Sequence, residues 1–200
     1  IMIIVFHNSA LLIIDVQNDF CPGGALAVPG GDTVIPSLNR YIALFCENEA
    51  PVFASRDWHP DNSQHFEEHG GTWPKHCVRN TEGARFHFDL DLPADVIVIS
   101  KGIQPDEDGY SAFEGRNEDE DDLEKILKEK QIDRLYIGGL ATEYCVKNTV
   151  CDALRRGFQV GLLVDAVKGI DREPGDSERA LKEMKQAGAS TIAQDEKTSV

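Results

Sequence analysis

Short apolar runs alternate with amphipathic segments along the chain. The runs are nearly continuous, as expected for parallel strands that are buried on both faces. In the segments between them, apolar residues recur three and four positions apart, which is typical of helices with one buried side. The pattern predicts strands over 10–16, 51–56, 95–100, 132–140 and 158–164, a short sixth strand over 189–193, and helices over 32–45, 123–127, 142–156 and 177–187.

This alternation predicts an α/β protein of three α/β/α layers around a central, mostly parallel sheet, as in Rossmann-like folds. The chain has no internal repeat or linker, so residues 1–200 are expected to form a single domain. Ligands of such sheets bind beyond the carboxyl ends of the strands. Asp15, Asp57, Lys101 and the turn 141–145 each follow a different predicted strand. The sequence therefore predicts one site where these groups meet.

Four of the six histidines fall in the long loop after the second predicted strand. Taken alone, each is better explained as a surface residue, and His69, beside two glycines, is expected to be one. Asp57 and His59 project to the same side of an extended chain because they are two residues apart. Three imidazoles and a carboxylate suit Zn, Fe, Mn or Co, whereas Ca and Mg prefer oxygen ligands. The set predicts one divalent transition metal, with zinc as the first candidate, held by Asp57, His59, His65 and His76.

A nucleophile is predicted at the start of the helix that follows the fourth strand. Cys145 lies three residues after the predicted N-cap Thr142, and a helix N-terminus and a nearby cation lower the pKa of a thiol. Lys101 can be that cation, and Asp15 can accept the thiol proton and return it to a leaving group. Backbone N–H groups around Ala141 and Cys145 would form an oxyanion hole. Taken alone, each residue has a plainer explanation. Cys145 could be a buried structural thiol, Lys101 a strand-end lysine whose ammonium group reaches solvent, and Asp15 a carboxylate that caps a helix or holds a loop.

The composition of the chain argues against several classes of binding partner. The formal net charge is −15, which argues against nucleic acid and anionic membranes because both require basic patches. No apolar run is long enough for a membrane span, and residues 1–6 lack the features of a signal peptide and are expected at the edge of the fold. Five cysteines without a Cys-x-x-Cys pair favour free thiols in a reducing cytoplasm. We expect a small-molecule substrate, and a homo-oligomer is compatible with the sequence.

Several longer motifs are specific enough to indicate a family. Together they resemble the isochorismatase-like cysteine hydrolases, and the aspartate and histidines resemble the metal-binding nicotinamidase (pyrazinamidase) branch. The similarity extends over roughly 10–171. It rests on Asp15-Val-Gln-Asn-Asp-Phe20-Cys-Pro-Gly-Gly, Asp57-Trp-His59 with His65, Trp73-Pro-Lys-His76-Cys-Val, Lys101-Gly, Asp108-Gly-Tyr110-Ser-Ala-Phe113 and Gly138-Gly-Leu-Ala-Thr-Glu-Tyr-Cys145-Val.

The resemblance implies that Asp15, Lys101 and Cys145 are a catalytic triad and that the aspartate and three histidines named above bind the metal. It further implies that Phe20 and Trp73 sandwich a pyridine ring, whose nitrogen the metal takes directly or through water. Two more features follow from it: Tyr110 as a substrate contact and a cis peptide between Leu140 and Ala141. The activity it implies is hydrolysis of nicotinamide and pyrazinamide to the acids and ammonia through a thioester, as in NAD salvage.

Two alternatives remain open at this stage. One is another hydrolase of the superfamily, acting on a different small amide or ureido substrate, which metal content and the aromatic clamp would distinguish. The other is a metal-dependent binding module without turnover, which would bind a ligand without releasing ammonia. One departure from the family pattern is Glu143, where aspartate is frequent, and the additional methylene lies outside the triad.

Overall fold

The computed structural model describes residue 5 and residues 7–194. Residues 1–4, 6 and 195–200 lie outside the described residues, so most of the expected edge segment 1–6 is not described. Strands are β1 (Ser9–Ile14), β2 (Val52–Asp57), β3 (Ile97–Lys101), β4 (Arg134–Leu140), β5 (Gln159–Lys168) and β6 (Ser190–Ile192). Helices are α1 (Ile35–Glu47), α2 (Leu123–Glu129), α3 (Lys147–Arg155) and α4 (Asp176–Ala187), with a π-helical turn over Thr142–Val146 and 3-10 turns over Asn18–Phe20, Gly31–Val34, Glu67–His69 and Ala112–Glu114.

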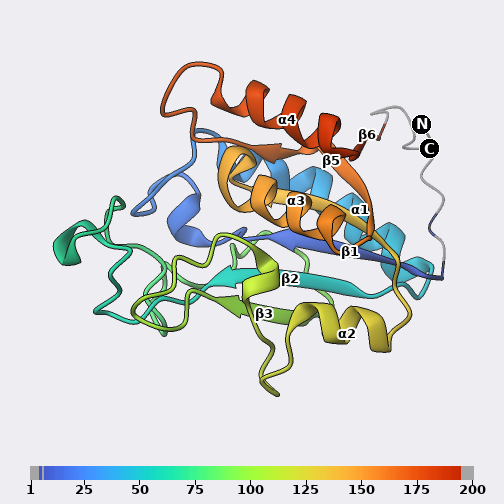
Figure 1. Ribbon diagram of the computed structural model, residues 1–200, viewed down its shortest axis with the longest axis horizontal. Coiled ribbons are helices and arrows are strands. Elements are labelled where there is room, and N and C mark those ends of the chain that lie inside the picture. The colour runs from blue at the N-terminus through green and yellow to red at the C-terminus, as the bar shows by residue number, and fades with distance from the viewer. Residues whose placement is uncertain (1–4, 6, 195–200) are drawn as a thin grey trace.

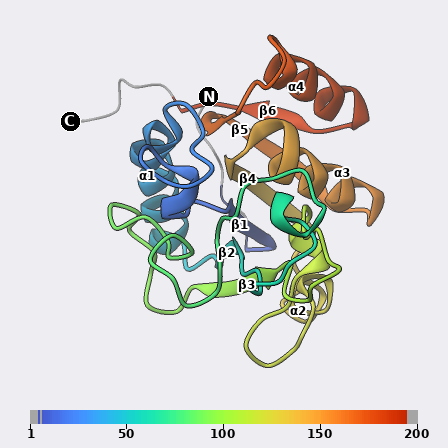
Figure 2. The ribbon, with the colours of Figure 1, turned by 90° about the vertical axis from the view of Figure 1, so that its left-hand side faces the viewer.

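The strands form a single sheet in the order β3-β2-β1-β4-β5-β6, and every described pair is parallel. Helix α1 packs on one face, and α2, α3 and α4 pack on the other. Figure 2 shows the sheet between these layers, with α1 on its own side. The predicted three-layer α/β/α fold is confirmed, with its helices divided unequally between the two faces.

Strand β1 lies inside the sheet, between β2 and β4, and this position explains why its sequence is almost wholly apolar. Leu11 and Ile13 pack in the core on the α1 side, whereas Leu12 and Ile14 pack in the core on the other. All four side chains are completely buried. Burial of one such side chain stabilises a fold by about 1.5–3 kcal/mol, so β1 anchors both cores.

Several element boundaries differ from the sequence prediction. The helix expected from residue 32 begins at Ile35, after a 3-10 turn. Strand β5 continues to Lys168, past its predicted end at 164. The carboxylate of Asp165 accepts a hydrogen bond from the Tyr41 hydroxyl at 2.7 Å, so α1 satisfies this polar side chain and the strand need not end there. Finally, Asp57 and Lys101 are the last residues of their strands, where the sequence placed them just beyond.

The connections between the strands indicate which edge of the sheet binds a ligand. The chain runs outward from β1 to β2 and β3, then returns to β4 on the other side of β1. The order of strands therefore reverses between β1 and β4, and such a reversal opens a crevice at the carboxyl ends. The long segment after β2 lies at this end of the molecule, on the left in Figure 1. No helix within residues 7–194 is long and apolar enough to cross a membrane.

Candidate active site

Three charged or nucleophilic side chains meet at the carboxyl ends of β1, β3 and β4. Asp15 follows β1, Lys101 ends β3 and Cys145 lies in the π-helical turn after β4. The Lys101 Nζ is 2.8 Å from the Asp15 Oδ2 and 3.5 Å from the Cys145 Sγ. All three side chains are buried. The structure therefore brings together the residues that the sequence predicts as a triad.

Burial and charge set the protonation of this trio. Burial raises the pKa of Asp15, against the opposing effect of the Lys101 charge. Burial would lower the pKa of Lys101, but the charges of Asp15 and Asp57 raise it well above its ordinary value. Burial also raises the pKa of the Cys145 thiol well above its usual range, although Lys101 pulls it down. The expected lowering of the thiol pKa is thus outweighed by burial, and the cysteine requires a base.

Cys145 is presented by a wider turn than the sequence predicts. Thr142 was the predicted N-cap of an α-helix, but Ala141 precedes the turn, and no side chain caps it. The carbonyl of Ala141 accepts hydrogen bonds from Tyr144 N at 3.1 Å and Val146 N at 3.2 Å. The Leu140–Ala141 peptide is cis, in agreement with the family resemblance. Single π-helical turns of this kind are rare and are frequent at functional sites.

The three predicted histidine ligands come together in the loop after β2. One nitrogen from each of His59, His65 and His76 lies within 4.8 Å of the others, and all three residues are buried. Each Nδ1 has a fixed partner: the Gly102 carbonyl at 3.0 Å from His59, the Asp108 Oδ1 at 2.9 Å from His65, and the Pro74 carbonyl at 2.7 Å from His76.

These partners make the histidine cluster suitable for a metal. Carbonyl and carboxylate oxygens only accept hydrogen bonds, so each Nδ1 carries the proton and each Nε2 keeps a lone pair. Metal-ligating histidines are oriented by such a bond from the other ring nitrogen. The Nε2 of His59 is buried without a hydrogen-bond partner, which is costly unless another group uses its lone pair. The residues therefore fit a transition metal, whereas His69 is exposed and does not belong to the cluster.

Asp57 lies between the triad and the histidines. Its Oδ1 is paired with the Lys101 Nζ. Its Oδ2 is 3.7 Å from the His59 Nε2 and 3.8 Å from the His76 Nε2. Burial would raise the pKa of Asp57, but the Lys101 charge holds it well below the ordinary value, so the side chain is an anion. The predicted fourth ligand thus touches both parts of the site.

Two backbone features position these ligands. Gln17 accepts a hydrogen bond from Asp57 N at 2.8 Å and donates one to the Asp57 carbonyl at 2.8 Å, which fixes the end of β2. Gly102 has a φ of +62°, and a Cβ at this position would clash with the ring of His59. Only glycine therefore fits where the chain leaves β3 beneath the histidine.

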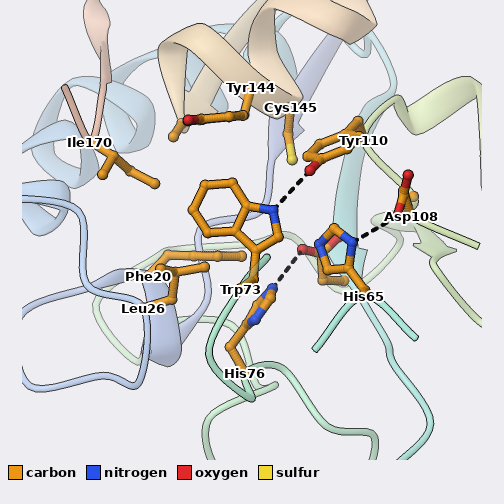
Figure 3. Close-up of a pocket in the computed structure, with 13 residues that line it drawn as sticks. Phe20, Leu26, His65, Trp73, His76, Asp108, Tyr110, Tyr144, Cys145 and Ile170 are labelled. Atoms are coloured by element: carbon orange, nitrogen blue, oxygen red, sulfur yellow. Dashed lines mark hydrogen bonds and ion pairs between the residues drawn. The ribbon is translucent and has the colours of Figure 1, made fainter. Parts of the chain in front are cut away.

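A pocket connects Cys145 with two of the clustered histidines, His65 and His76. The Trp73 Nε1 donates a hydrogen bond to the Tyr110 hydroxyl at 2.8 Å, and Phe20 lies across the pocket from Cys145 in Figure 3. The lining consists of Phe20, Leu26, Asp57, His65, Trp73, His76, Asp108, Gly109, Tyr110, Ala141, Tyr144, Cys145 and Ile170.

Sequence reasoning did not assign a role to five of these lining residues, and one of them, Gly109, accepts a hydrogen bond from the Lys101 Nζ at 2.6 Å through its carbonyl. Asp108 orients His65, and Leu26, Tyr144 and Ile170 supply apolar walls. Asp108 begins the motif Asp108-Gly-Tyr110-Ser-Ala-Phe113, and this motif is the sequence signal that points to it. Leu26 and Ile170 lie in loops far apart in sequence, so only the folded chain reveals that they share a pocket.

A buried thiol beside a carboxylate and a lysine, at the edge of a parallel sheet, is the arrangement of a cysteine hydrolase of the α/β class. The isochorismatase domain model matches residues 9–196, and the chain belongs to this family. It is 43% identical to a nicotinamidase of Escherichia coli, over 94% of this chain and 97% of that protein.

Solved structures give the same result. A pyrazinamidase of Pyrococcus horikoshii in complex with zinc is 52% identical, with a TM-score of 0.87 over 94% of this chain and 99% of that chain. A structure from L. infantum in complex with nicotinate is 31% identical, with a TM-score of 0.84 over 97% and 100% of the two chains. These similarities extend over nearly the whole chain.

Proposed function

We propose that this protein hydrolyses nicotinamide to nicotinate and ammonia, and pyrazinamide in the same way, through a thioester on Cys145. The observation that carries the proposal is a single pocket lined by the buried Cys145 thiol and by His65 and His76, two members of the three-histidine cluster. A pyridine carboxamide has a group for each: an amide carbon for the sulfur and a ring nitrogen for a metal. The nicotinamidase relative and the nicotinate complex of a similar structure support the same substrate.

The first half of the reaction forms the thioester. Asp15, whose pKa is raised by burial, takes the proton of the Cys145 thiol as the sulfur attacks the amide carbon. The backbone N–H groups of Ala141 and Cys145 stabilise the oxyanion. The carbon–nitrogen bond then breaks, Asp15 returns its proton to the leaving nitrogen, and ammonia departs. Lys101 stays charged throughout and stabilises whichever of its neighbours is an anion.

The second half releases the acid. Asp15 accepts a proton from water as the water oxygen attacks the thioester carbon, and the same backbone donors stabilise the second oxyanion. The carbon–sulfur bond breaks, and Asp15 returns the proton to the Cys145 sulfur. The product is nicotinic acid, which ionises to nicotinate on release. One carboxylate thus serves both halves, and an oxygen of Asp15 lies within 4.8 Å of the Cys145 Sγ.

Asp57, His59, His65 and His76 are proposed to hold one divalent transition metal. Zinc is the first candidate because the similar pyrazinamidase of Pyrococcus horikoshii was solved with zinc, and iron and manganese suit the same ligands. Such a metal supplies a Lewis acid that attracts the ring nitrogen. The protein's own contribution is to fix the three Nδ1 atoms, which leaves the three Nε2 lone pairs available, and one ring nitrogen from each histidine lies within 4.8 Å of the others.

The aromatic residues are proposed to hold the ring flat. Phe20 and Trp73 are almost fully buried and offer two apolar faces to the pocket. Tyr110 accepts the Trp73 Nε1 hydrogen bond and thereby fixes the orientation of the indole. A planar, neutral ring fits such a clamp, whereas a substrate with two carboxylates, such as isochorismate, would enter an acidic protein without a nitrogen for the metal. All five cysteines are free thiols, which supports a cytoplasmic role in NAD salvage.

The test compares nicotinamide with benzamide, which differ at one ring atom. Ammonia release by the purified, metal-loaded protein is expected from nicotinamide and pyrazinamide, with kcat/KM for benzamide lower by at least roughly 10-fold because its ring lacks the nitrogen. Equal kcat/KM for nicotinamide and benzamide would show that the ring nitrogen is not recognised. Absence of ammonia from both amides would contradict the proposed activity and favour a different substrate.

A further inference from the structure

The segment 169–172, between β5 and α4, forms one wall of the catalytic pocket. Ile170 lines this pocket, and it also lines a separate groove on the other side of the segment, together with Pro29, Thr142 and Leu181. The segment is therefore a partition between two spaces. In Figure 3, Ile170 and Leu26 lie on the side of the pocket opposite His65.

The side chain of Glu143 holds this partition in place. Its Oε1 accepts hydrogen bonds from Ile170 N at 2.8 Å and from Asp171 N at 2.7 Å. Its Oε2 lies 3.4 Å from the Ser177 Oγ. The backbone at Gly169 is packed so closely that a Cβ there would clash with the Glu143 carboxylate. Glu143 thus connects the turn that carries Cys145 directly to the opposite wall.

Two further contacts fix the partition at its far end. Asp171 adopts a φ of +51°, which is uncommon for a residue other than glycine. Its carboxylate accepts hydrogen bonds from Ser177 N at 2.8 Å and Ser177 Oγ at 2.9 Å, at the start of α4. The next residue, Arg172, places its guanidinium carbon 5.2 Å from the centroid of the Trp73 ring. The sharp turn is therefore tied to α4 and to the aromatic clamp.

The geometry of the substrate indicates which part of the ring meets this wall, and this step rests on the proposed function. In nicotinamide the nitrogen is ring position 1 and the carboxamide is on position 3. When position 1 faces the histidines and position 3 faces Cys145, the edge between them is position 2. Position 5 is diametrically opposite, so it points away from both groups, toward the side that holds Ile170 and Leu26.

We propose that Ile170 limits the size of substituents at ring position 5, and that Glu143 is a positioning residue that holds Ile170 against the ring. Glu143 does not touch the reacting atoms in this account. It affects the specificity among pyridine-3-carboxamides, because its hydrogen bonds to two backbone N–H groups hold Ile170 in position. Loss of either side chain would open the pocket toward the neighbouring groove.

The test measures kcat/KM for 5-methylnicotinamide relative to nicotinamide. A methyl group at an apolar wall changes discrimination by about 10–200-fold, so Ile170→Ala and Glu143→Ala should each raise this ratio by at least roughly 10-fold. Glu143→Gln retains a carbonyl oxygen that can accept from both backbone N–H groups, and it should keep the wild-type ratio.

Asn39 offers a matched control. Its side chain also holds a loop through two hydrogen bonds, to the Asp89 carbonyl at 2.8 Å and from Asp91 N at 3.0 Å, but it lies on α1 away from the pocket. Asn39→Ala should leave the substrate ratio unchanged. If Ile170→Ala leaves the ratio unchanged, or if Glu143→Ala lowers kcat/KM equally for both substrates, the proposal is overturned.

Hydrogen exchange separates this proposal from the proposed function. The amides of Ile170 and Asp171 should exchange at least roughly 10-fold faster in Glu143→Ala than in the wild type, and at the wild-type rate in Glu143→Gln. Unchanged exchange in Glu143→Ala would contradict the positioning role, whatever the substrate. A wild-type protein that releases no ammonia from nicotinamide would instead refute the activity, with the exchange result still deciding the role of Glu143.

Discussion

Asp57 is the residue through which the two parts of the site act on each other. One carboxylate oxygen pairs with Lys101, and the other faces the Nε2 atoms of His59 and His76. Its negative charge stabilises the Lys101 cation and also contributes to the raised pKa of Asp15. The charge of any metal held by the histidines would therefore be felt at the base and the thiol.

Asp15 gives a prediction at the residue scale. Asp15→Asn preserves the shape of the side chain but cannot carry the proton, so kcat for nicotinamide should fall by roughly 10²–10⁴. Asp15 must be ionised to accept the thiol proton, and burial raises its pKa above the ordinary 3.8. Wild-type kcat/KM should therefore decline, as the pH is lowered, at a pH above 3.8. A variant that keeps more than a tenth of wild-type kcat would remove Asp15 from this role.

At the scale of elements, the sequence contained most of the fold. The six strands and the helices were predicted because β1 and its neighbours are buried on both faces, which leaves an apolar run, and because the helices repeat at regular spacing. Asp15, Lys101 and Cys145 could be brought together from sequence because each follows a strand, and parallel strands end at one edge.

Other features could not be predicted from local pattern. The π-helical turn at Cys145 has no sequence signature, so an α-helix with Thr142 as its N-cap was the expected form. The pKa of the Cys145 thiol depends on how much chain folds over it, and burial outweighs the Lys101 charge. The role of Glu143 depends on a loop that follows it by 27 residues, which only the fold brings near.

Gly102 gives a prediction at the scale of the loop after β3. Alanine at this position would strain the backbone, because φ is +62°, and would push against the His59 ring. Gly102→Ala should therefore reduce the metal bound per chain, as measured by elemental analysis after dialysis. Gly157→Ala is the matched control, because its φ is +88° but nothing lies within 4 Å of the added Cβ. Equal metal content in these two variants would argue against the contact with His59.

The charge of the whole molecule gives a prediction about substrate entry. A net charge of −15 repels anions and leaves neutral molecules unaffected, and salt screens this repulsion. Between about 0.02 and 0.5 M salt, kcat/KM for nicotinamide should change by less than about 2-fold. For a pyridine-3-carboxamide with an added carboxylate it should be low and should rise with salt. A value that falls steeply with salt for the anionic amide would indicate a local cationic entrance instead.

The central claim is that the whole fold serves to present the Cys145 sulfur to an amide. Steady-state ammonia release from nicotinamide by the metal-loaded Cys145→Ala protein tests it most directly, with Cys151→Ala as the control because that thiol lies in α3, outside the pocket. We predict release at the background rate from Cys145→Ala, with metal content and nicotinamide binding retained, and wild-type release from Cys151→Ala. Steady-state release by Cys145→Ala at a substantial fraction of the wild-type rate would contradict the thioester mechanism.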